Sequence, residues 1–175
     1  MSSFEGKDVF LGAATLRPET MYGQTNCFVL PEGEYGIYEM PGDWYLVCSE
    51  RAMKNIAHQD LTHEFGQFKE EGRVMGSDLI GVPLKAPLCP FDKVYVLPLL
   101  TISMDKGTGV VTSVPSDAPA DWAALNDFRT KADFRSKYGV KEEWVKDYEP
   151  VPIIEIPEYG TMIAEVLCKE FKVKS

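Results

Sequence analysis

The chain has 175 residues, of which 45% are hydrophobic and 26% are charged, which suits one ordinary globular domain and argues against disorder. Its 27 acidic residues outnumber its 18 basic residues, and the resulting net charge of −9 excludes a protein that binds nucleic acid mainly by neutralising phosphates. No apolar run reaches the roughly 20 residues that cross a bilayer, and the start of the chain lacks the pattern of a signal peptide, so we expect no membrane contact.

The cysteines and histidines are too few and too scattered to predict a metal site. The chain contains four cysteines and two histidines, namely Cys27, Cys48, Cys89, Cys168, His58 and His63. No two cysteines have the close spacing of a zinc ligand pair or of a redox motif. We therefore expect reduced thiols, no bound metal and a cytoplasmic location.

The first half of the chain predicts short strands separated by turns. The predicted strands are 8–15, which we expect to be mostly buried, 26–30, 35–40 and 44–48. Ser49 can cap a helix that runs to about His58, with Met53, Ile56 and Ala57 on its buried side. Residues 62–83 are interrupted by glycines and give no clear pattern.

The second half adds β-branched strands at 93–97 and 110–114, a late strand at 151–156 and a closing helix at 164–171. Between the strands at 110–114 and 151–156 we predict a helix that is capped by Ser116 or Asp117 and carries Asp121 in its first turn. Its apolar side comprises Trp122, Ala124, Leu125, Phe128 and Ala132. Because strands dominate and do not alternate with long helices, we predict an α+β fold whose mixed sheet curls into a small barrel flanked by helices.

Residues 13–26 form the first informative stretch. Thr15, Thr20 and Thr25 recur every five residues beside Arg17, and Pro18 forces a turn after the predicted first strand. Threonine hydroxyls and exposed backbone N–H groups at such a turn suit a ligand with a carbonyl or a hydroxyl group. The alternative is a capped turn in which the threonines only satisfy their own backbone.

Residues 106–121 form the second informative stretch. They begin with Gly107-Thr108-Gly109, which lacks the further glycine of a dinucleotide site and the Gly-Lys-Ser/Thr ending of a phosphate-binding loop. Asp117 and Asp121 follow at a helix start, where the helix dipole favours the ionised carboxylate. Such a carboxylate can bind an ammonium group, although simple helix capping is the alternative.

The two stretches together resemble the editing (connective peptide) domain of class I aminoacyl-tRNA synthetases. Thr15-Leu16-Arg17-Pro18-Glu19-Thr20, the run 107–121 and the Pro-rich run 148–157 are most similar to leucyl-tRNA synthetases of the eukaryotic and archaeal type. Valyl enzymes share Arg-Pro-Glu-Thr, whereas isoleucyl enzymes have a different threonine-rich run. The resemblance covers about residues 8–160.

The resemblance implies a single editing domain over 1–175, part of a larger synthetase, that hydrolyses the ester of misacylated tRNA(Leu). The signature motifs His-x-Gly-His and Lys-Met-Ser-Lys-Ser are missing, so we expect no aminoacylation, and ATP and magnesium would serve only the absent synthetic domain. The implied substrates are isoleucyl-, methionyl- and norvalyl-tRNA. The implied partners are the 3′ terminal adenosine and the rest of the synthetase, and we expect the isolated domain to be a monomer.

The resemblance also implies roles for single residues. Asp121 would bind the α-ammonium group of the wrong amino acid, and Thr20 would exclude leucine sterically. Thr15 would lie beside the ester and place the attacking water, and Arg17 would lie near the ester or the terminal phosphate. The resemblance further implies that five residues contact the adenosine or the pocket, and that Val114 forms the pocket floor. These residues are Leu16, Lys106, Thr112, Val114 and Asp117.

Three alternatives remain open at this point. The chain could be a non-catalytic insert that binds adenosine or an amino acid, a purely structural insert, or an editing domain of the valyl type. The basic residues between 129 and 146 could contact the tRNA end or form a solvated face; they are Arg129, Lys131, Arg135, Lys137, Lys141 and Lys146. Given the net charge of −9, we expect weak affinity for whole tRNA.

Overall fold

A computed structural model describes residues 4 and 6–173, which form two compact units. The first unit contains the described residues up to Ala14 together with Val29–Leu79 and Leu100–Val111. The second contains Thr15–Phe28, Ile80–Leu99 and the described residues from Thr112 onward. The predicted single domain 1–175 also includes residues 1–3, 5 and 174–175, which lie outside the described part.

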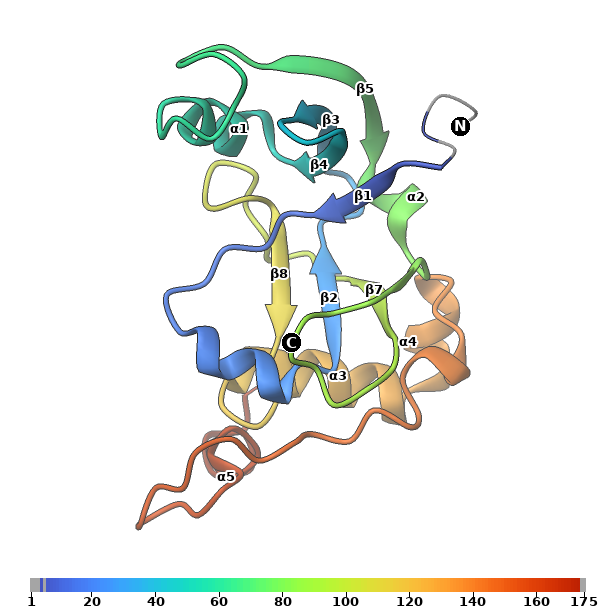
Figure 1. Ribbon diagram of the computed structural model, residues 1–175. Helices are drawn as coiled ribbons and strands as arrows, with labels where there is room; N and C mark the ends of the chain where they lie inside the picture. The colour runs from blue at the N-terminus through green and yellow to red at the C-terminus, as the bar shows by residue number, and fades with distance from the viewer. Residues whose placement is uncertain (1–3, 5, 174–175) are drawn as a thin grey trace. The chain divides into compact units, whose positions relative to one another are not determined.

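The first unit contains a four-stranded mixed sheet (Figure 1). Its strand order is β1-β4-β3-β5, with β1 at Asp8–Leu11, β3 at Glu34–Met40, β4 at Trp44–Cys48 and β5 at Lys69–Met75. β3 runs antiparallel to both of its neighbours, whereas β1 is parallel to β4. The predicted strands at 35–40 and 44–48 are therefore confirmed, and β5 lies in the region that had no clear pattern.

The helix predicted after Ser49 is confirmed as α1 (Glu50–Ala57). The Ser49 hydroxyl accepts a hydrogen bond from the backbone N–H of Ala52 at 3.2 Å, which satisfies one free donor of the helix start. Met53 and Ala57 are fully buried, as the apolar spacing predicts. α1 packs onto the sheet through a cluster made of Tyr38, Met40, Leu46, Cys48, Ala52 and Met53.

The prediction of a long and mostly buried strand at 8–15 is wrong on both counts. β1 ends at Leu11, and the side chains of Val9 and Phe10 are 47% and 52% exposed. The reason is the place of β1 at the edge of the sheet, where it pairs only with β4. Beyond it Gly12 packs closely on Leu46, and the chain leaves the sheet.

The second sheet has the strand order β6-β7-β2-β8. These strands are β2 (Asn26–Val29), β6 (Pro83–Leu84), β7 (Val94–Pro98) and β8 (Val110–Ser113), which confirms the strands predicted at 26–30, 93–97 and 110–114. Every residue of β2 is buried, as expected of a central strand. The α+β class is thus confirmed, but the described strands form two separate four-stranded sheets rather than a closed barrel. Closure would require the edge strands to pair, and β6 has only two residues.

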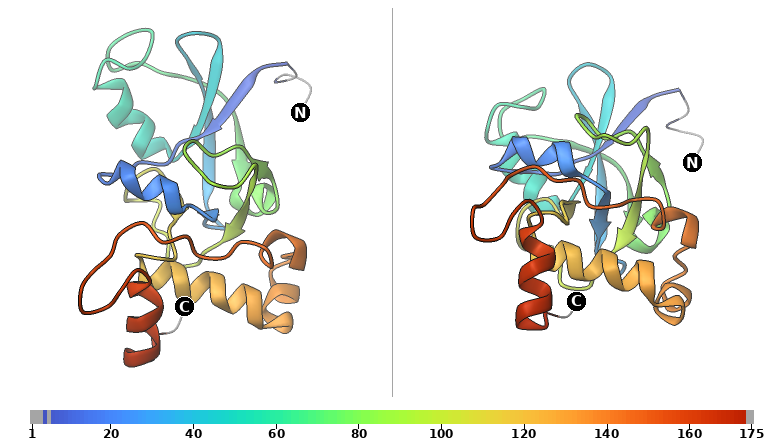
Figure 2. Two further views of the ribbon diagram at one scale, coloured as in Figure 1. Left: turned by 60° about the horizontal axis from the view of Figure 1, so that its bottom comes forward. Right: turned by 90° about the horizontal axis from the view of Figure 1, so that it is seen from below.

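The helices of the second unit are α3 (Pro119–Thr130), α4 (Ala132–Lys137) and α5 (Ile163–Phe171), with short 3-10 turns η2 (Pro18–Gly23) and η3 (Glu142–Trp144). α5 packs against α3, as Figure 2 shows in both views. Ala124, Leu125 and Phe128 are buried on α3, as predicted. Ala132 instead starts α4 and is exposed, because Lys131 has an extended backbone that ends α3.

The remaining helix, α2 (Gly76–Leu79), belongs to the first unit. No helix in the described part of the chain is long and apolar enough to cross a membrane.

The predicted strand at 151–156 is wrong. This segment has no strand pairing beyond an isolated bridge between Ile156 and Gly160. Pro150, Pro152 and Pro157 explain the difference, because proline has no N–H to donate to a sheet. The segment packs instead against the end of η2, within the second unit.

Candidate functional site

The threonine-rich bend is built around the backbone of Arg17, the residue that precedes η2. The Arg17 N–H donates to the Thr15 hydroxyl at 3.0 Å. The Arg17 carbonyl accepts from the Thr20 N–H at 3.0 Å and from the Thr20 hydroxyl at 2.6 Å. Thr15 is exposed, whereas Thr20 is only 9% exposed. The threonines therefore do satisfy their own backbone, as the capped-turn alternative expects, and the bend is held in one conformation.

The residues that lead into α3 are organised around Val114, which is buried. The Val114 N–H donates to the Asp121 carboxylate at 2.9 Å, and the Val114 carbonyl accepts from the N–H groups of Asp117 and Ala118. The first residue before α3 is Ala118, which caps nothing with its side chain, so the predicted cap by Ser116 or Asp117 is wrong. The reason is that both side chains have other partners. The Ser116 hydroxyl donates to the Asp117 carboxylate, and that carboxylate also binds a guanidinium, that of Arg17.

Arg17 joins the two informative stretches. Nη2 of Arg17 lies 3.2 Å from Oδ2 of Asp117, a hundred residues away along the chain. Nε of Arg17 lies 3.0 Å from Oε1 of Glu19, and the Glu19 and Asp117 carboxylates raise the pKa of the guanidinium. A backbone hydrogen bond from Thr25 to the Ser113 carbonyl, at 3.1 Å, links the same two segments.

Asp121 is a buried carboxylate whose negative charge has few partners in the protein. Its side chain accepts from the Val114 N–H, and no cationic side chain among the described residues pairs with it. Burial raises the pKa of Asp121 to about 6, partly offset by the Val114 N–H. Desolvation therefore raises the pKa of Asp121 by more than the helix dipole, which was expected to favour the ionised form, lowers it. The carboxylate is still mostly ionised at neutral pH, and a cationic ligand would relieve the cost of burying its charge.

The other predicted contact residues have less distinct settings. Leu16 is fully exposed on the bend, and Thr112 is half-buried near the end of β8. Lys106 is exposed and belongs to the first unit. The structure thus brings the bend together with Asp117 and places Val114 against Asp121. It offers no contact that defines a role for Leu16, Thr112 or Lys106.

Sequence reasoning missed two residues around the bend. Glu19 binds Arg17, and its place two residues further along the Arg-Pro-Glu-Thr run was the available signal. Ile153 packs on the end of η2, where a Cβ atom added to Gly23 would lie 2.4 Å from Ile153 Cδ1. The Pro-rich run 148–157 therefore supports the bend within the second unit.

Replacing Gly23 by alanine should destabilise the protein by about 1–3 kcal/mol, because the added methyl group overlaps Ile153 and the core must shift. Thermal or urea unfolding measures the effect. Shortening the neighbour with Ile153→Val in the same chain should recover part of the loss, since it removes the nearest atom. A Gly23→Ala variant as stable as the wild type would contradict this packing.

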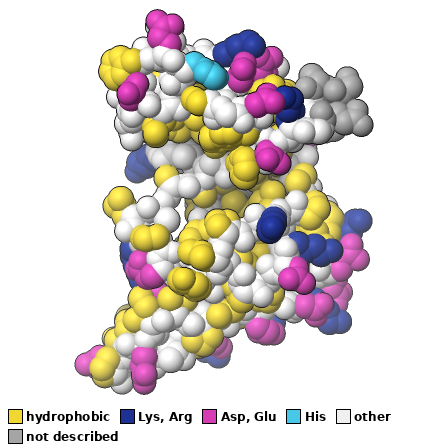
Figure 3. All heavy atoms as spheres, viewed as in Figure 1, with side chains coloured by type: hydrophobic (Ala, Val, Ile, Leu, Met, Phe, Trp, Pro, Cys, Tyr) yellow, Lys and Arg dark blue, Asp and Glu magenta, His cyan; other side chains and the backbone are white. Residues whose placement is uncertain are grey.

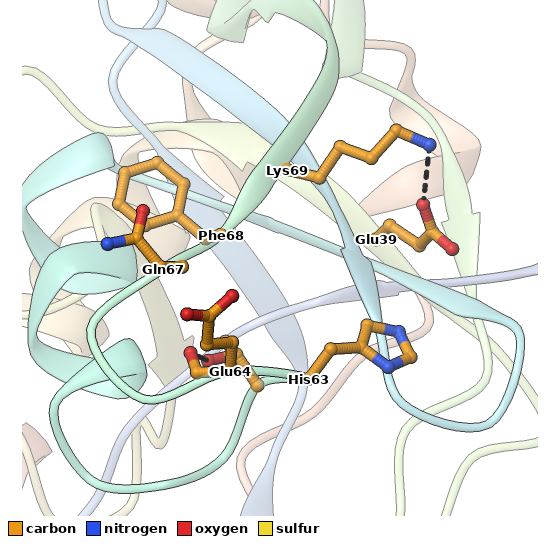
Figure 4. Close-up of a pocket in the computed structure, with 7 residues that line it drawn as sticks. Glu39, His63, Glu64, Gln67, Phe68 and Lys69 are labelled. Carbon is orange, nitrogen blue, oxygen red and sulfur yellow. Dashed lines mark hydrogen bonds and ion pairs between the residues drawn. The ribbon is translucent and has the colours of Figure 1, made fainter.

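The described residues also line a hollow in the first unit, of about 480 Å³ (Figure 4). Its lining comprises Glu39, Thr62, His63, Glu64, Gln67, Phe68 and Lys69. Lys69 and Glu39 face each other across β5 and β3 and form an ion pair at 2.8 Å. None of the predicted site residues lines this hollow. Among the described residues, no group of three His, Cys, Asp or Glu side chains is placed to hold a metal ion.

The basic residues between 129 and 146 are mostly neutralised by acids. Five of the six are ion-paired, in the pairs Arg129–Glu149, Lys131–Asp127, Arg135–Glu142, Lys141–Glu143 and Lys146–Glu142. Lys137 lies over the Tyr138 ring. In Figure 3 cationic and acidic side chains are intermingled around α4. The structure favours a solvated, charge-balanced face over a basic patch for nucleic acid.

The chain is similar in sequence to cytoplasmic leucine–tRNA ligases. It is 50% identical to that of Dictyostelium discoideum over 171 residues and 50% identical to that of Arabidopsis thaliana over 175 residues. These matches cover 98% and 100% of this chain but only 16% of each relative, so the chain spans about a sixth of their length. No family model matches the chain.

The fold is similar to solved structures of one part of that enzyme. The crystal structure of GlLeuRS-CP1 matches with a TM-score of 0.90 and 50% identity, over 95% of this chain and 61% of that one. The editing domain of the P. falciparum cytosolic leucyl-tRNA synthetase matches with a TM-score of 0.89 and 28% identity, over 98% of this chain and 63% of that one. The chain is therefore similar over nearly its whole length to leucyl-tRNA synthetases, and its fold is similar to solved editing domains of that family.

Proposed function

We propose that this chain hydrolyses the ester bond of misacylated tRNA(Leu), with isoleucyl-, methionyl- and norvalyl-tRNA as substrates. The observation that carries the proposal is the Arg17–Asp117 ion pair, which joins the threonine-rich bend to the residues that lead into the Asp121 helix. The similarity to leucyl-tRNA synthetase editing domains supports it. Editing is needed because a synthetic site rejects a near-isostere by only about 1–3 kcal/mol per methylene.

Asp121 is the proposed binding group for the α-ammonium of the wrong amino acid. Its buried carboxylate lacks a cationic partner among the described residues, so an ammonium group gives it the charge-assisted hydrogen bond that the protein does not. Every aminoacyl ester carries this ammonium, so Asp121 fixes the orientation of the ester and not the choice of side chain. That choice is assigned to Thr20, which is buried in the bend.

Hydrolysis proceeds in this proposal by direct attack of a water molecule placed beside Thr15. The water oxygen bonds to the ester carbonyl carbon, the bond from that carbon to the ribose oxygen breaks, and the ribose oxygen takes the proton that the water loses. Backbone N–H groups stabilise the negative charge on the carbonyl oxygen, and the neighbouring ribose hydroxyl assists. An aminoacyl ester is already labile, so positioning carries much of the rate, and no metal or cofactor takes part. His58 and His63 lie outside both informative stretches, and the proposal gives them no part in catalysis.

The other predicted contact residues and the two compact units also have roles in this proposal. We assign Leu16, Thr112 and Val114 to the space for the terminal adenosine or the amino-acid side chain, and we assign Lys106 a contact with the adenosine. The two compact units act as one editing domain that works, as a monomer when isolated, with the rest of a cytoplasmic synthetase. Because that synthetic part binds ATP and magnesium, this chain charges no tRNA by itself.

Incubation of the chain with tRNA(Leu) charged with isoleucine, norvaline or leucine tests the proposal. We expect release of free isoleucine and norvaline, and survival of the leucyl ester. Binding of the charged tRNA without release would indicate a non-catalytic module instead. Neither binding nor release would leave only a structural role.

The isolated chain should bind whole tRNA weakly, with a dissociation constant in the micromolar range or above that rises with salt. The reasons are the net charge of −9 and the ion pairing of the basic residues around α4. Filter binding or fluorescence anisotropy at two salt concentrations measures it. A nanomolar constant that does not change with salt would contradict this prediction.

A further inference from the structure

The guanidinium of Arg17 is held from two sides. Glu19 binds Nε at 3.0 Å and Asp117 binds Nη2 at 3.2 Å. The two acids differ in setting, because the Asp117 side chain is 9% exposed while that of Glu19 is 49% exposed. A guanidinium is planar and rigid, so a partner fixed at Nε also fixes the direction in which Nη2 points.

Glu19 is itself well fixed for this task. It lies in the first turn of η2, directly after Pro18, whose ring restricts the backbone. Its own backbone N–H and then the Arg17 guanidinium lower the pKa of the Glu19 carboxyl, so it is ionised at neutral pH. No proposed contact with substrate uses Glu19, although it lies within the bend that carries Thr15 and Thr20.

We propose that Glu19 is a positioning residue of the editing site: by binding Nε of Arg17 it directs Nη2 to Asp117 and so ties the threonine-rich bend to the residues that lead into α3. The effect of Glu19 on catalysis rests on the proposed function, whereas its contact with Arg17 does not depend on that function. Exposed ion pairs add little stability, so Glu19 matters for placing Thr15 and Thr20 and not for holding the fold. A small displacement of positioning groups is enough to slow a reaction substantially.

The ion pairs also bear on what Arg17 can bind. Arg17, Glu19 and Asp117 together carry one positive and two negative charges, so the two carboxylates weaken the attraction between the guanidinium and a phosphate. If Arg17 served mainly to bind the terminal phosphate, removing the Glu19 charge would free it and lower the KM for tRNA. If Glu19 positions Arg17, the same change lowers kcat and leaves KM nearly unchanged. The two roles thus predict opposite results.

The test compares Glu19→Gln, which keeps the shape and loses the charge, with Glu19→Asp, which keeps the charge. Glu165→Gln is the matched control, because Glu165 also forms an ion pair in the second unit, with Lys169 on α5. On isoleucyl-tRNA we expect about a tenfold lower kcat for Glu19→Gln with KM changed less than about twofold. Glu19→Asp should recover part of the rate, the control should match the wild type, and all melting temperatures should agree closely.

The second readout needs no activity. The Nε–H signal of Arg17 in a nitrogen-15 NMR spectrum, assigned with Arg17→Lys, should be slow to exchange in the wild type. It should shift and exchange faster in Glu19→Gln. A wild type without deacylase activity would overturn the proposed function, and this signal would still decide the placement of Arg17. An Arg17 signal unaffected by Glu19→Gln, a lowered KM, or an unchanged kcat in an active enzyme would each overturn the positioning role.

Discussion

Replacing Asp121 by asparagine should slow the hydrolysis of every misacylated tRNA by at least about 100-fold, because the variant keeps an oxygen for the Val114 N–H but loses the charge that binds the α-ammonium. The loss should be equal for isoleucyl- and norvalyl-tRNA, since both carry the same ammonium group. Single-turnover deacylation rates measure it.

The same variant should be more stable than the wild type at neutral pH, by about 1–3 kcal/mol. Burial raises the pKa of Asp121 from 3.8 to about 6, so ionising this carboxylate costs free energy in the folded state. Asparagine removes that cost and retains the hydrogen bond to Val114. A residue whose loss improves stability and removes activity is kept for function and not for folding.

The stability difference between the wild type and Asp121→Asn should depend on pH. Because the folded pKa of Asp121 lies above 3.8, the folded state binds a proton that the unfolded state has lost between about pH 4 and pH 6. Wild-type stability should therefore fall across this window, relative to Asp121→Asn, and the difference should be constant above it. Activity should change in the opposite direction and rise as pH increases through about 6, where the carboxylate ionises.

Asp133→Asn is the matched control for both measurements. Asp133 also lies in the first turn of a helix of the second unit, α4, but it is exposed. We expect neither its activity nor its stability curve to differ from the wild type. Full turnover by Asp121→Asn, or a lower stability than the wild type at pH 7, would remove Asp121 from the proposed mechanism.

The sequence predicted well those elements whose formation depends on neighbouring residues. The turn residues Pro41-Gly42-Asp43 separate β3 from β4, and Ser49 caps α1, so all three elements form where expected. The strand at 151–156 failed although its composition is rich in valine and isoleucine. Pro152 within it and Pro150 and Pro157 on either side indicated the opposite, because proline has no N–H to donate to a sheet.

Features set by distant pairing were out of reach. Whether β1 is buried depends on its position in the strand order, and that order joins segments far apart in the chain. The same holds for the site. The two informative stretches were recognised from their residues, but the ion pair between Arg17 and Asp117, and the burial that raises the pKa of Asp121, arise only from packing.

Replacing Thr20 by alanine should let the protein hydrolyse correctly charged leucyl-tRNA, with a rate increase of about 10- to 100-fold, because the removed atoms make room for the branched leucine side chain. The isoleucyl ester should still be hydrolysed at a similar rate. Deacylation of the two charged tRNAs, measured side by side, gives the ratio. An unchanged ratio would contradict the steric role.

The structure complicates this prediction, because the Thr20 hydroxyl also donates to the Arg17 carbonyl at 2.6 Å. Alanine removes that hydrogen bond together with the bulk, and a loosened bend could admit leucine for a different reason. Thr20→Val keeps the bulk and loses the hydrogen bond, at a cost of about 1 kcal/mol in stability. Thr20→Ser keeps the hydroxyl and loses only the methyl group.

The three variants separate shape from hydrogen bonding at one position. If bulk excludes leucine, the valine variant should still spare leucyl-tRNA, whereas alanine should hydrolyse it and serine should be intermediate. If the hydrogen bond to the Arg17 carbonyl is what excludes leucine, valine should behave like alanine and serine like threonine. Because Thr20 is buried within a turn whose backbone is already satisfied, we expect the first pattern. The second would move the origin of specificity from the side chain of Thr20 to the conformation of the whole bend.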